Sequence, residues 1–262
     1  MSFAHYTAQM PVQKPKLHVD HLSLAYERDG KSIAVLDQVQ FEVGAGEFIC
    51  IVGPSGCGKS TLLNTMAGFL KPTSGRVAID GEPVDGPDPR RILVFQQNAA
   101  FPWLTVEENI GFGLHKLPRA ERDRRVSHYI DLVRLRDFEK AYPSDLSGGM
   151  NQRLQVARAL ALNPDVLYLD EPFGALDSIT RLIMRGELLR IWEAERNTIV
   201  FVTHDIDEAV QLADRVVVLS SRPARVEHIT TIDVPHPRNI SSSRYLELRD
   251  AILEQIGLAH SV

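Results

Sequence analysis

The chain carries the sequence Phe48-Ile-Cys-Ile-Val-Gly-Pro-Ser-Gly-Cys-Gly-Lys-Ser-Thr61. The residues up to Val52 are wholly apolar, as in a buried central strand, and those that follow match G-x-x-x-x-G-K-[ST]. A helical pattern then runs from Thr61 to about Ala67. Glycines let backbone N–H groups turn inward around a phosphate, and the helix N-terminus adds partial positive charge. We predict a nucleotide site, in which Lys59 reaches the β and γ phosphates and Ser60 holds Mg²⁺. The alternative is a glycine-rich turn with a solvated lysine.

A second motif, Val166-Leu-Tyr-Leu-Asp170-Glu171, is an apolar strand that ends in two adjacent carboxylates. Ligands of parallel sheets lie at the carboxyl ends of the strands, and Mg²⁺ in such sites takes one or two carboxylates. We therefore predict that Asp170 binds Mg²⁺ and that Glu171 is the general base for the attacking water. The alternative is a solvated acidic turn.

Short apolar runs recur along the chain with helical patterns between several of them, which indicates an α/β fold with a largely parallel sheet. The further runs are Ile92–Phe95, Val166–Leu169, Ile199–Val202 and Val216–Leu219. Before them, Leu17–Tyr26 alternates as a strand, and Asp29-Gly30 predicts a turn into a second strand that ends near Val43. We expect a P-loop NTPase core with an N-terminal antiparallel β-subdomain.

The stretch from about residue 98 to residue 159 has few strand signals and includes a charged helix that starts near Pro118. A last helix is predicted from about Tyr245 to Ile256, with Gly257 as its stop. We therefore divide the chain into a flexible leader (1–16), the nucleotide-binding core with its β-subdomain (17–97 and 160–225), a helical insertion (98–159) and a C-terminal strand and helix extension (226–262).

Composition excludes several classes of protein. The chain has 29 basic and 34 acidic residues, a net charge of −5, whereas nucleic-acid binders usually carry a basic excess. No apolar run approaches the ~18 residues that span a membrane, and residues 1–16 lack the apolar region of a secretory signal. Two cysteines, Cys50 and Cys57, are consistent with a reducing cytosol.

The sequence Leu146-Ser-Gly-Gly-Met150 precedes a helical run from Asn151 to about Leu162 and so predicts a second anion-binding helix N-terminus. Here the chain resembles the ATP-binding subunits of ABC transporters over nearly its whole length. The family's signature usually reads LSGGQ, and Met150 stands in place of the glutamine. The nitrate-type branch of the family tolerates methionine here, so the resemblance does not imply inactivation.

Other family elements match in order. Gln96 after Val94-Phe95 fits the Q-loop, and Gln97 is a rival that points to the opposite face of the strand. Gly174–Asp177 resembles the D-loop, His204 fits the switch histidine, and Tyr26 fits the aromatic residue that stacks on adenine. The resemblance thus implies catalytic roles for Glu171, His204 and Gln96, and Mg²⁺ contacts for Ser60, Gln96 and Asp170. Each of these residues also has a non-functional alternative. Tyr26 could lie in the core, Gln96 could be a polar surface residue, and His204 could be a structural histidine.

The motifs and the resemblance together imply one set of ATP-binding residues: Tyr26, Gly53, Pro54, Ser55, Gly56, Cys57, Gly58, Lys59, Ser60, Thr61, Ser147, Gly148, Gly149 and Asp177. Cys57 is expected to be a small loop filler and not a nucleophile. Because family members place the signature of one chain over the phosphates of another, the resemblance implies a head-to-tail homodimer. Lys59 and Ser60 then act in cis, Ser147 and Gly149 act in trans, and Asp177 crosses the interface.

The resemblance also implies two kinds of partner, transmembrane permease subunits and an extracytoplasmic solute-binding protein. We expect no nucleic-acid partner. The chain would lie on the cytoplasmic face of the membrane, held there only through the permease. The family's permease contact corresponds to Asn98–Asn109, where Phe101, Trp103 and Leu104 are either contact residues or core of the insertion.

The substrate is predicted by resemblance alone. Pro102-Trp103, Met150 and the tail Arg244–Leu253 resemble the nitrate, taurine and sulfonate importers. Related importers carry aromatic acids or thiamine-precursor pyrimidines. Rival functions are an ABC ATPase that does no transport, a module that binds ATP without turnover, and a small-molecule kinase. The second is opposed by four intact residues: Lys59, Asp170, Glu171 and His204. The signature argues against the third.

Overall fold

A computed structural model describes residues 14–28, 30–95, 100–174 and 176–257. Its centre is a six-stranded sheet with the order β10-β9-β3-β8-β7-β6. These strands are β3 (Phe48–Val52), β6 (Arg91–Val94), β7 (Val166–Asp170), β8 (Thr198–Val202), β9 (Arg215–Leu219) and β10 (Val226–Thr231). All neighbours pair in parallel except β10, which is antiparallel to β9. The prediction of a largely parallel sheet is confirmed.

A second, antiparallel sheet has the order β2-β1-β4-β5. It consists of β1 (Leu17–Arg28), β2 (Lys31–Val43), β4 (Ser74–Ile79) and β5 (Glu82–Pro83). The predicted hairpin of β1 and β2 is present, and its register pairs Leu17 with Val43. We did not predict β4 and β5 from the sequence, because β4 buries only Val77 and Ile79 and so contains no apolar run.

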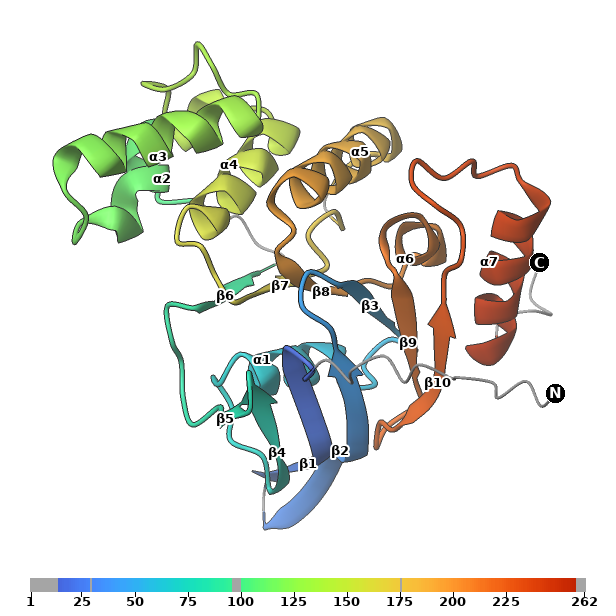
Figure 1. Ribbon diagram of the computed structural model, residues 1–262. Coiled ribbons are helices and arrows are strands. Elements are labelled where there is room, and N and C mark those ends of the chain that lie inside the picture. Colours follow the sequence, from blue (N-terminus) through green and yellow to red (C-terminus); the bar gives the residue numbers. More distant parts are fainter. Residues whose placement is uncertain (1–13, 29, 96–99, 175, 258–262) are drawn as a thin grey trace, which may run out of the picture.

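Helices cover the parallel sheet on both faces and extend beyond one edge of it (Figure 1). They are α1 (Lys59–Met66), α2 (Val106–Gly111), α3 (Arg119–Leu132), α4 (Gly148–Leu160), α5 (Ser178–Glu195), α6 (Ile206–Leu212) and α7 (Ser243–Gln255), with short 3₁₀ turns η1 (Phe112–Leu114) and η2 (Pro143–Asp145). The group α2, α3 and α4 projects past β6, and α7 packs on α6 at the opposite end. The mostly helical stretch after β6 is where the sequence predicted it, and our division into subdomains remains a prediction.

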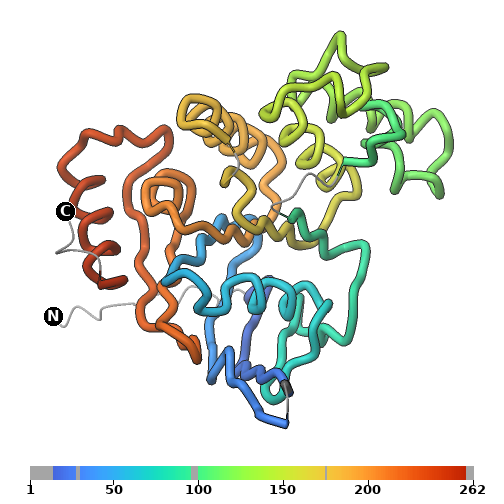
Figure 2. The backbone as a smooth tube through the Cα atoms, turned by 180° about the vertical axis from the view of Figure 1, so that it is seen from behind, coloured from blue at the N-terminus to red at the C-terminus, as the bar shows by residue number. Residues whose placement is uncertain are grey.

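The β3 strand explains why its sequence is apolar throughout. Phe48, Cys50 and Val52 join a core with α2–α7, whereas Ile49 and Ile51 join a second core with α1 and the antiparallel sheet. The view from behind shows the same layering, with α1, β1 and β2 on one side of the parallel strands and α5 and α6 on the other (Figure 2). Burial on both faces holds the carboxyl ends of β3, β7 and β8 at one edge of the sheet.

Candidate nucleotide site

The loop between β3 and α1 requires glycine at two positions. At Gly58, which caps α1, φ is 125° and an added Cβ would lie 2.9 Å from Cγ1 of Val35. At Gly53, an added Cβ would lie 2.8 Å from the carbonyl oxygen of Leu219. The loop therefore packs tightly against β2 and β9, and α1 begins at Lys59 with its N-terminus toward the loop, as a phosphate site requires.

Lys59 is the buried cation of this loop, with only 7% of its surface exposed. Its Nζ donates hydrogen bonds to the carbonyl oxygens of Gly53 at 2.9 Å and Pro54 at 3.1 Å. These contacts hold the ammonium group over the loop. Cys57, by contrast, is buried, and burial raises the pKa of its thiol, which suits a filler and not a nucleophile.

Asp170 ends β7 and faces the start of α1. Burial raises the pKa of its carboxyl group, neighbouring Glu171 raises it further, and a hydrogen bond from Ser60 opposes both effects. Its Oδ1 is buried and has no hydrogen-bond partner among the described residues. A buried carboxylate oxygen without a partner, next to a serine hydroxyl, fits a hard cation such as Mg²⁺. Among the described residues, no group of three or more His, Cys, Asp or Glu side chains that could hold a metal ion occurs.

Glu171 and His204 meet where β7 and β8 end. His204 Nδ1 lies 3.0 Å from Oε2 of Glu171, and the backbone N–H of Glu171 donates to the carbonyl of Val202 at 2.9 Å. Glu171 has φ of 45°, a left-handed conformation that is uncommon for residues other than glycine. The side chain of His204 is 62% exposed and that of Glu171 is 25% exposed. Water therefore reaches both groups.

Lys59, Glu171 and His204 line one cleft of about 560 Å³, whereas Asp170 is not among its lining residues. Its lining comprises Ser55, Gly56, Gly58, Lys59, Ser60, Thr61, Glu171, His204 and Arg222. We did not predict Arg222, whose Nη2 donates to the carbonyl of Gly56 at 2.8 Å. The loop after β9 carries no sequence motif. In the structure β9 lies next to β3, and ligands of parallel sheets bind at the carboxyl ends of the strands, so this adjacency places the loop at the site.

The signature and D-loop residues lie apart from this cleft. Ser147 caps α4 by accepting from the N–H of Met150, and Asp177 caps α5 by accepting from the N–H groups of Ile179 and Thr180. The hydrogen bonds from Thr180 hold the pKa of Asp177 below its usual range. An added Cβ on Gly149 would lie 3.0 Å from Cγ2 of Thr180, so the starts of α4 and α5 adjoin. Neither Ser147 nor Asp177 lines the cleft with Lys59.

Tyr26 is a further predicted site residue that the structure places outside the cleft. Tyr26 lies on β1 with 43% of its surface exposed, so the core alternative for Tyr26 is wrong, and it does not line the phosphate-loop cleft. Gln96 and its rival Gln97 lie outside the described residues.

An aromatic cluster flanks α2, with Phe101 and Trp103 before the helix and Phe112 directly after it. Trp103 is 69% exposed and stacks on Phe101 with ring centroids 5.4 Å apart, and Phe112 lies 4.5 Å from Phe101. The core alternative for Trp103 is therefore wrong, whereas Phe101 is half-buried. The guanidinium of Arg158 lies 4.5 Å from the Phe101 ring, a cation–π contact that helps to fix the ring.

The fold and the cleft together define an ABC-type nucleotide-binding cassette, and the comparisons with known proteins agree. The family model described as ABC transporter matches residues 36–174. The uncharacterized ABC transporter ATP-binding protein MJ0412 of Methanocaldococcus jannaschii is 48% identical, covering 92% of this chain and 91% of that protein. The aliphatic sulfonates import ATP-binding protein SsuB of Bacillus cereus is 43% identical, covering 90% of this chain and 94% of that protein.

Solved structures give the same result. A dimeric structure of MJ0796, a bacterial ABC transporter cassette, matches with a TM-score of 0.71 and 34% identity over 82% of this chain and 98% of that chain. The cbiO1 protein from Clostridium perfringens, part of the ABC transporter complex cbiONQ, matches with a TM-score of 0.76 and 27% identity over 95% of this chain and 99% of that chain. The chain belongs to the ABC transporter family and is an ATPase of that family, as the signature Leu146–Met150 predicted.

No helix in the described part of the chain is long and apolar enough to span a membrane.

Proposed function

We propose that this ATPase powers an importer that takes up a small solute of the sulfonate, taurine or nitrate type through separate permease subunits. The observation that carries the proposal is the 43% identity to an aliphatic sulfonate import protein over 90% of the chain. The Pro102-Trp103 pair, Met150 and the tail Arg244–Leu253 support it as sequence features. A solute-binding protein outside the cell would deliver the solute to the permease.

In the proposed mechanism, Lys59 and the loop N–H groups bind the β and γ phosphates of ATP, and Ser60 and Asp170 hold Mg²⁺ together with Gln96. Mg²⁺ bound there supplies positive charge that neutralises the phosphates. Glu171 accepts the proton of the attacking water, and His204, 3.0 Å from its carboxylate, orients that carboxylate and contacts the γ-phosphate. Tyr26 stacks on the adenine.

The second half of each site comes from another copy of the chain. Ser147 is exposed and Gly149 is buried at the start of α4, where the helix dipole favours an anion, yet neither lines the cleft of Lys59. A head-to-tail homodimer would place this helix start over the partner's γ-phosphate and bring Asp177 across the interface. Two ATP molecules would then be enclosed between two subunits.

The permease contact is proposed at the exposed cluster of Phe101, Trp103 and Phe112. Exposed aromatic residues that are held in place suit the anchors of a protein interface. Beside the cluster lies an apolar cavity of about 200 Å³, partly lined by Val94 and Leu162, which would receive a permease side chain. Binding to the membrane would be through the permease alone, on its cytoplasmic face, because a net charge of −5 offers little attraction to anionic lipid.

The Glu171→Gln variant tests the mechanism. Glutamine keeps the shape of the side chain but does not accept a proton, and general-base catalysis contributes about 10²–10⁴-fold. We expect ATP to bind normally and turnover to fall by that factor. Size-exclusion chromatography with ATP and Mg²⁺ should show a dimer for the variant and mostly monomer for the parent. Near-parental ATPase activity would refute the role of Glu171, and an inactive monomer would count against the composite sites.

Substrate class is tested with the assembled importer in vesicles. ATP hydrolysis is measured while taurine, an aliphatic sulfonate, nitrate, an aromatic acid or a thiamine-precursor pyrimidine is added with the solute-binding protein. We expect stimulation by a sulfonate, taurine or nitrate. Stimulation by one of the last two alone would replace the proposed substrate class, and hydrolysis without any permease dependence would favour a non-transport ATPase.

A further inference from the structure

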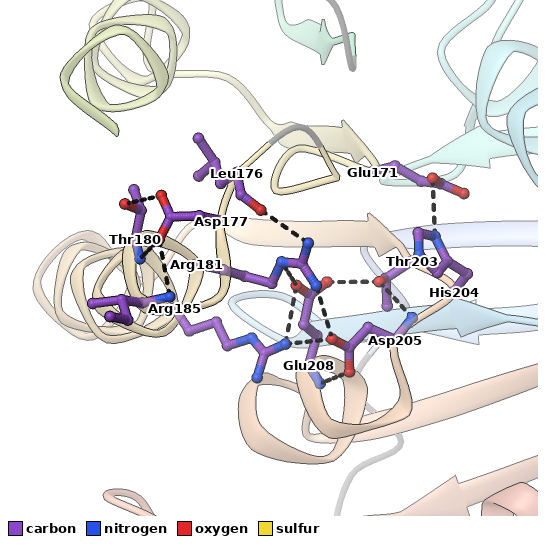
Figure 3. Close-up of polar contacts among 11 residues, drawn as sticks. Glu171, Leu176, Asp177, Thr180, Arg181, Arg185, Thr203, His204, Asp205 and Glu208 are labelled. Carbon is purple, nitrogen blue, oxygen red and sulfur yellow. Dashed lines mark hydrogen bonds and ion pairs between the residues drawn. The ribbon is translucent and has the colours of Figure 1, made fainter. Parts of the chain in front are cut away.

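A cluster of four charged side chains joins α5 to the start of α6 (Figure 3). Arg185 Nη2 lies 2.5 Å from Asp205 Oδ2 and 3.2 Å from Glu208 Oε1. Arg181 adds longer ion pairs, 3.6 Å to Asp205 and 3.8 Å to Glu208. The side chains of Arg185 and Glu208 are only 11% and 5% exposed, so these charges interact with little screening by water.

On one side, this cluster holds the residues that flank His204. Thr203 Oγ1 donates to Glu208 Oε2 at 2.6 Å, and it accepts from the N–H of Asp205 at 3.0 Å. Asp205 in turn caps α6 by accepting from the N–H of Glu208 at 3.1 Å. The backbone on both sides of His204 is therefore fixed by Glu208 and Asp205, and through them by the two arginines.

On the other side, the cluster reaches the D-loop. Arg181 Nη2 donates to the carbonyl oxygen of Leu176 at 3.0 Å, directly before Asp177. One guanidinium group thus contacts the backbone next to Asp177 and the carboxylates that hold the loop of His204. Figure 3 shows Arg181 between Leu176 and the pair Asp205 and Glu208.

The two arginines are not equivalent. Arg185 has the shorter contacts with both carboxylates, so it continues to neutralise Asp205 and Glu208 when Arg181 is removed. Of the two, Arg181 is the one that also bonds Leu176. Burial raises the pKa of Glu208, and the Thr203 hydrogen bond and the Arg185 charge oppose that rise, which agrees with Arg185 as the main counter-ion. Replacing Arg181 should therefore break the link between Leu176 and the two carboxylates without leaving a buried charge unpaired.

We propose that Arg181 is a positioning residue that couples the D-loop at Asp177 to His204 within each subunit. The inference rests on the proposed function, in which Asp177 contacts the partner subunit and His204 acts at the subunit's own ATP. Closure of the partner on Asp177 then moves or fixes the backbone at Leu176, and Arg181 transmits that position to the loop of His204. Occupation of one ATP site would in this way set the geometry of hydrolysis at the other.

The test is a double-mutant cycle on ATP hydrolysis by the full chain, with Arg181→Met, His204→Ala and both changes together. Single-turnover measurements keep slow variants in range. We expect Arg181→Met to lower kcat by about 3- to 30-fold, with KM for ATP within about 2-fold because the Lys59 loop is unchanged. In the His204→Ala background, Arg181→Met should lower kcat by less than about 2-fold, because Arg181 acts through His204. The Hill coefficient for ATP should fall toward one.

Two further variants control the cycle. Arg244→Met removes an arginine from an exposed ion pair with Asp233 on the C-terminal extension and should leave kcat unchanged. Arg181→Lys keeps a cation near the carboxylates but lacks the planar fork that also bonds Leu176. We therefore expect Arg181→Lys to lower kcat nearly as much as Arg181→Met does. If Arg181→Met does not fold, Arg181→Lys carries the cycle.

Independent losses that multiply, or an unchanged Hill coefficient, would overturn the coupling while leaving the proposed function intact. Normal turnover by His204→Ala would instead refute the assignment of His204, and the coupling with it.

Discussion

At the scale of single residues, Asp170 shows how a binding site opposes stability. Its side chain is half-buried beside Glu171, and burial is the main reason that its pKa is raised. The Ser60 hydrogen bond offsets only part of this effect. Because the folded pKa lies above the unfolded value, ionised Asp170 destabilises the free protein at neutral pH, and this destabilisation disappears as pH falls below the folded and then the unfolded pKa.

We therefore predict that Asp170→Asn raises the Tm of the nucleotide-free chain while it weakens Mg²⁺-dependent ATP binding. A gain of about 1 kcal/mol corresponds to roughly 2–4 °C for a chain of this size. Thermal unfolding at pH 7 and near pH 4 measures it, and the difference between variant and parent should shrink at the lower pH. Asp37→Asn, at an exposed ion pair with Arg225, is the matched control. A lower Tm for Asp170→Asn would contradict the account of its pKa.

At the scale of elements, the loop before α2 combines exposure with rigidity. Asn109 is fully buried, and its Nδ2 donates to the carbonyls of Leu104 at 2.9 Å and Thr105 at 3.0 Å. Its Oδ1 accepts from the N–H of Phe101 at 2.8 Å. Thr105 and Glu108 form a capping box at the same helix start. Phe101 and Trp103 are thus presented on a loop that the buried amide of Asn109 holds.

This arrangement predicts opposite effects of two substitutions. Asn109→Ala leaves several buried backbone groups unpaired and should lower the free energy of unfolding by about 2–4 kcal/mol. Trp103→Ala removes an exposed ring and should leave the Tm unchanged, but it should reduce recovery of the permease complex and transport. Ile240→Ala, also at an exposed apolar residue, controls for surface apolarity. Recovery of the permease complex and transport at the parental level with Trp103→Ala would contradict the proposed contact.

Some of these elements and contacts could be predicted from the sequence, and others could not. The strand, loop and helix around Lys59 were predictable because a local motif specifies all three, and Ser147 was predictable as a cap because serine accepts the N–H groups of a helix start. The strand β4 was missed, since it buries two side chains against β1. Arg222 and the Arg181 cluster were missed because their roles depend on partners far along the chain, such as Gly56 for Arg222 and Glu208 for Arg185. Asn109 bonds residues within its own loop, but no sequence motif marks a buried asparagine.

At the scale of the whole molecule, the fold separates two halves of what the motifs describe as one site. The phosphate loop, Asp170 and Glu171 lie at one edge of the parallel sheet, whereas Ser147 starts a helix in the group that projects past β6 (Figure 1). The alternatives are a large internal rotation of that helical group and a second copy that supplies the signature. The proposed head-to-tail dimer is the second of these, and a mixing experiment discriminates between the two.

Two inactive variants should restore activity when they are mixed. Lys59→Ala removes the cation of the phosphate loop, and Ser147→Arg places a bulky side chain on the exposed start of α4, so each homodimer lacks a complete site. A mixed dimer has one site with both defects and one site with neither. Random pairing gives about half mixed dimers with one working site of two, so we expect roughly a quarter of parental ATP turnover. Each variant alone, and a chain with both changes, serves as control. Because an internal rotation would join the phosphate loop and signature of the same chain, activity that stays at the level of the separate variants would contradict the head-to-tail dimer.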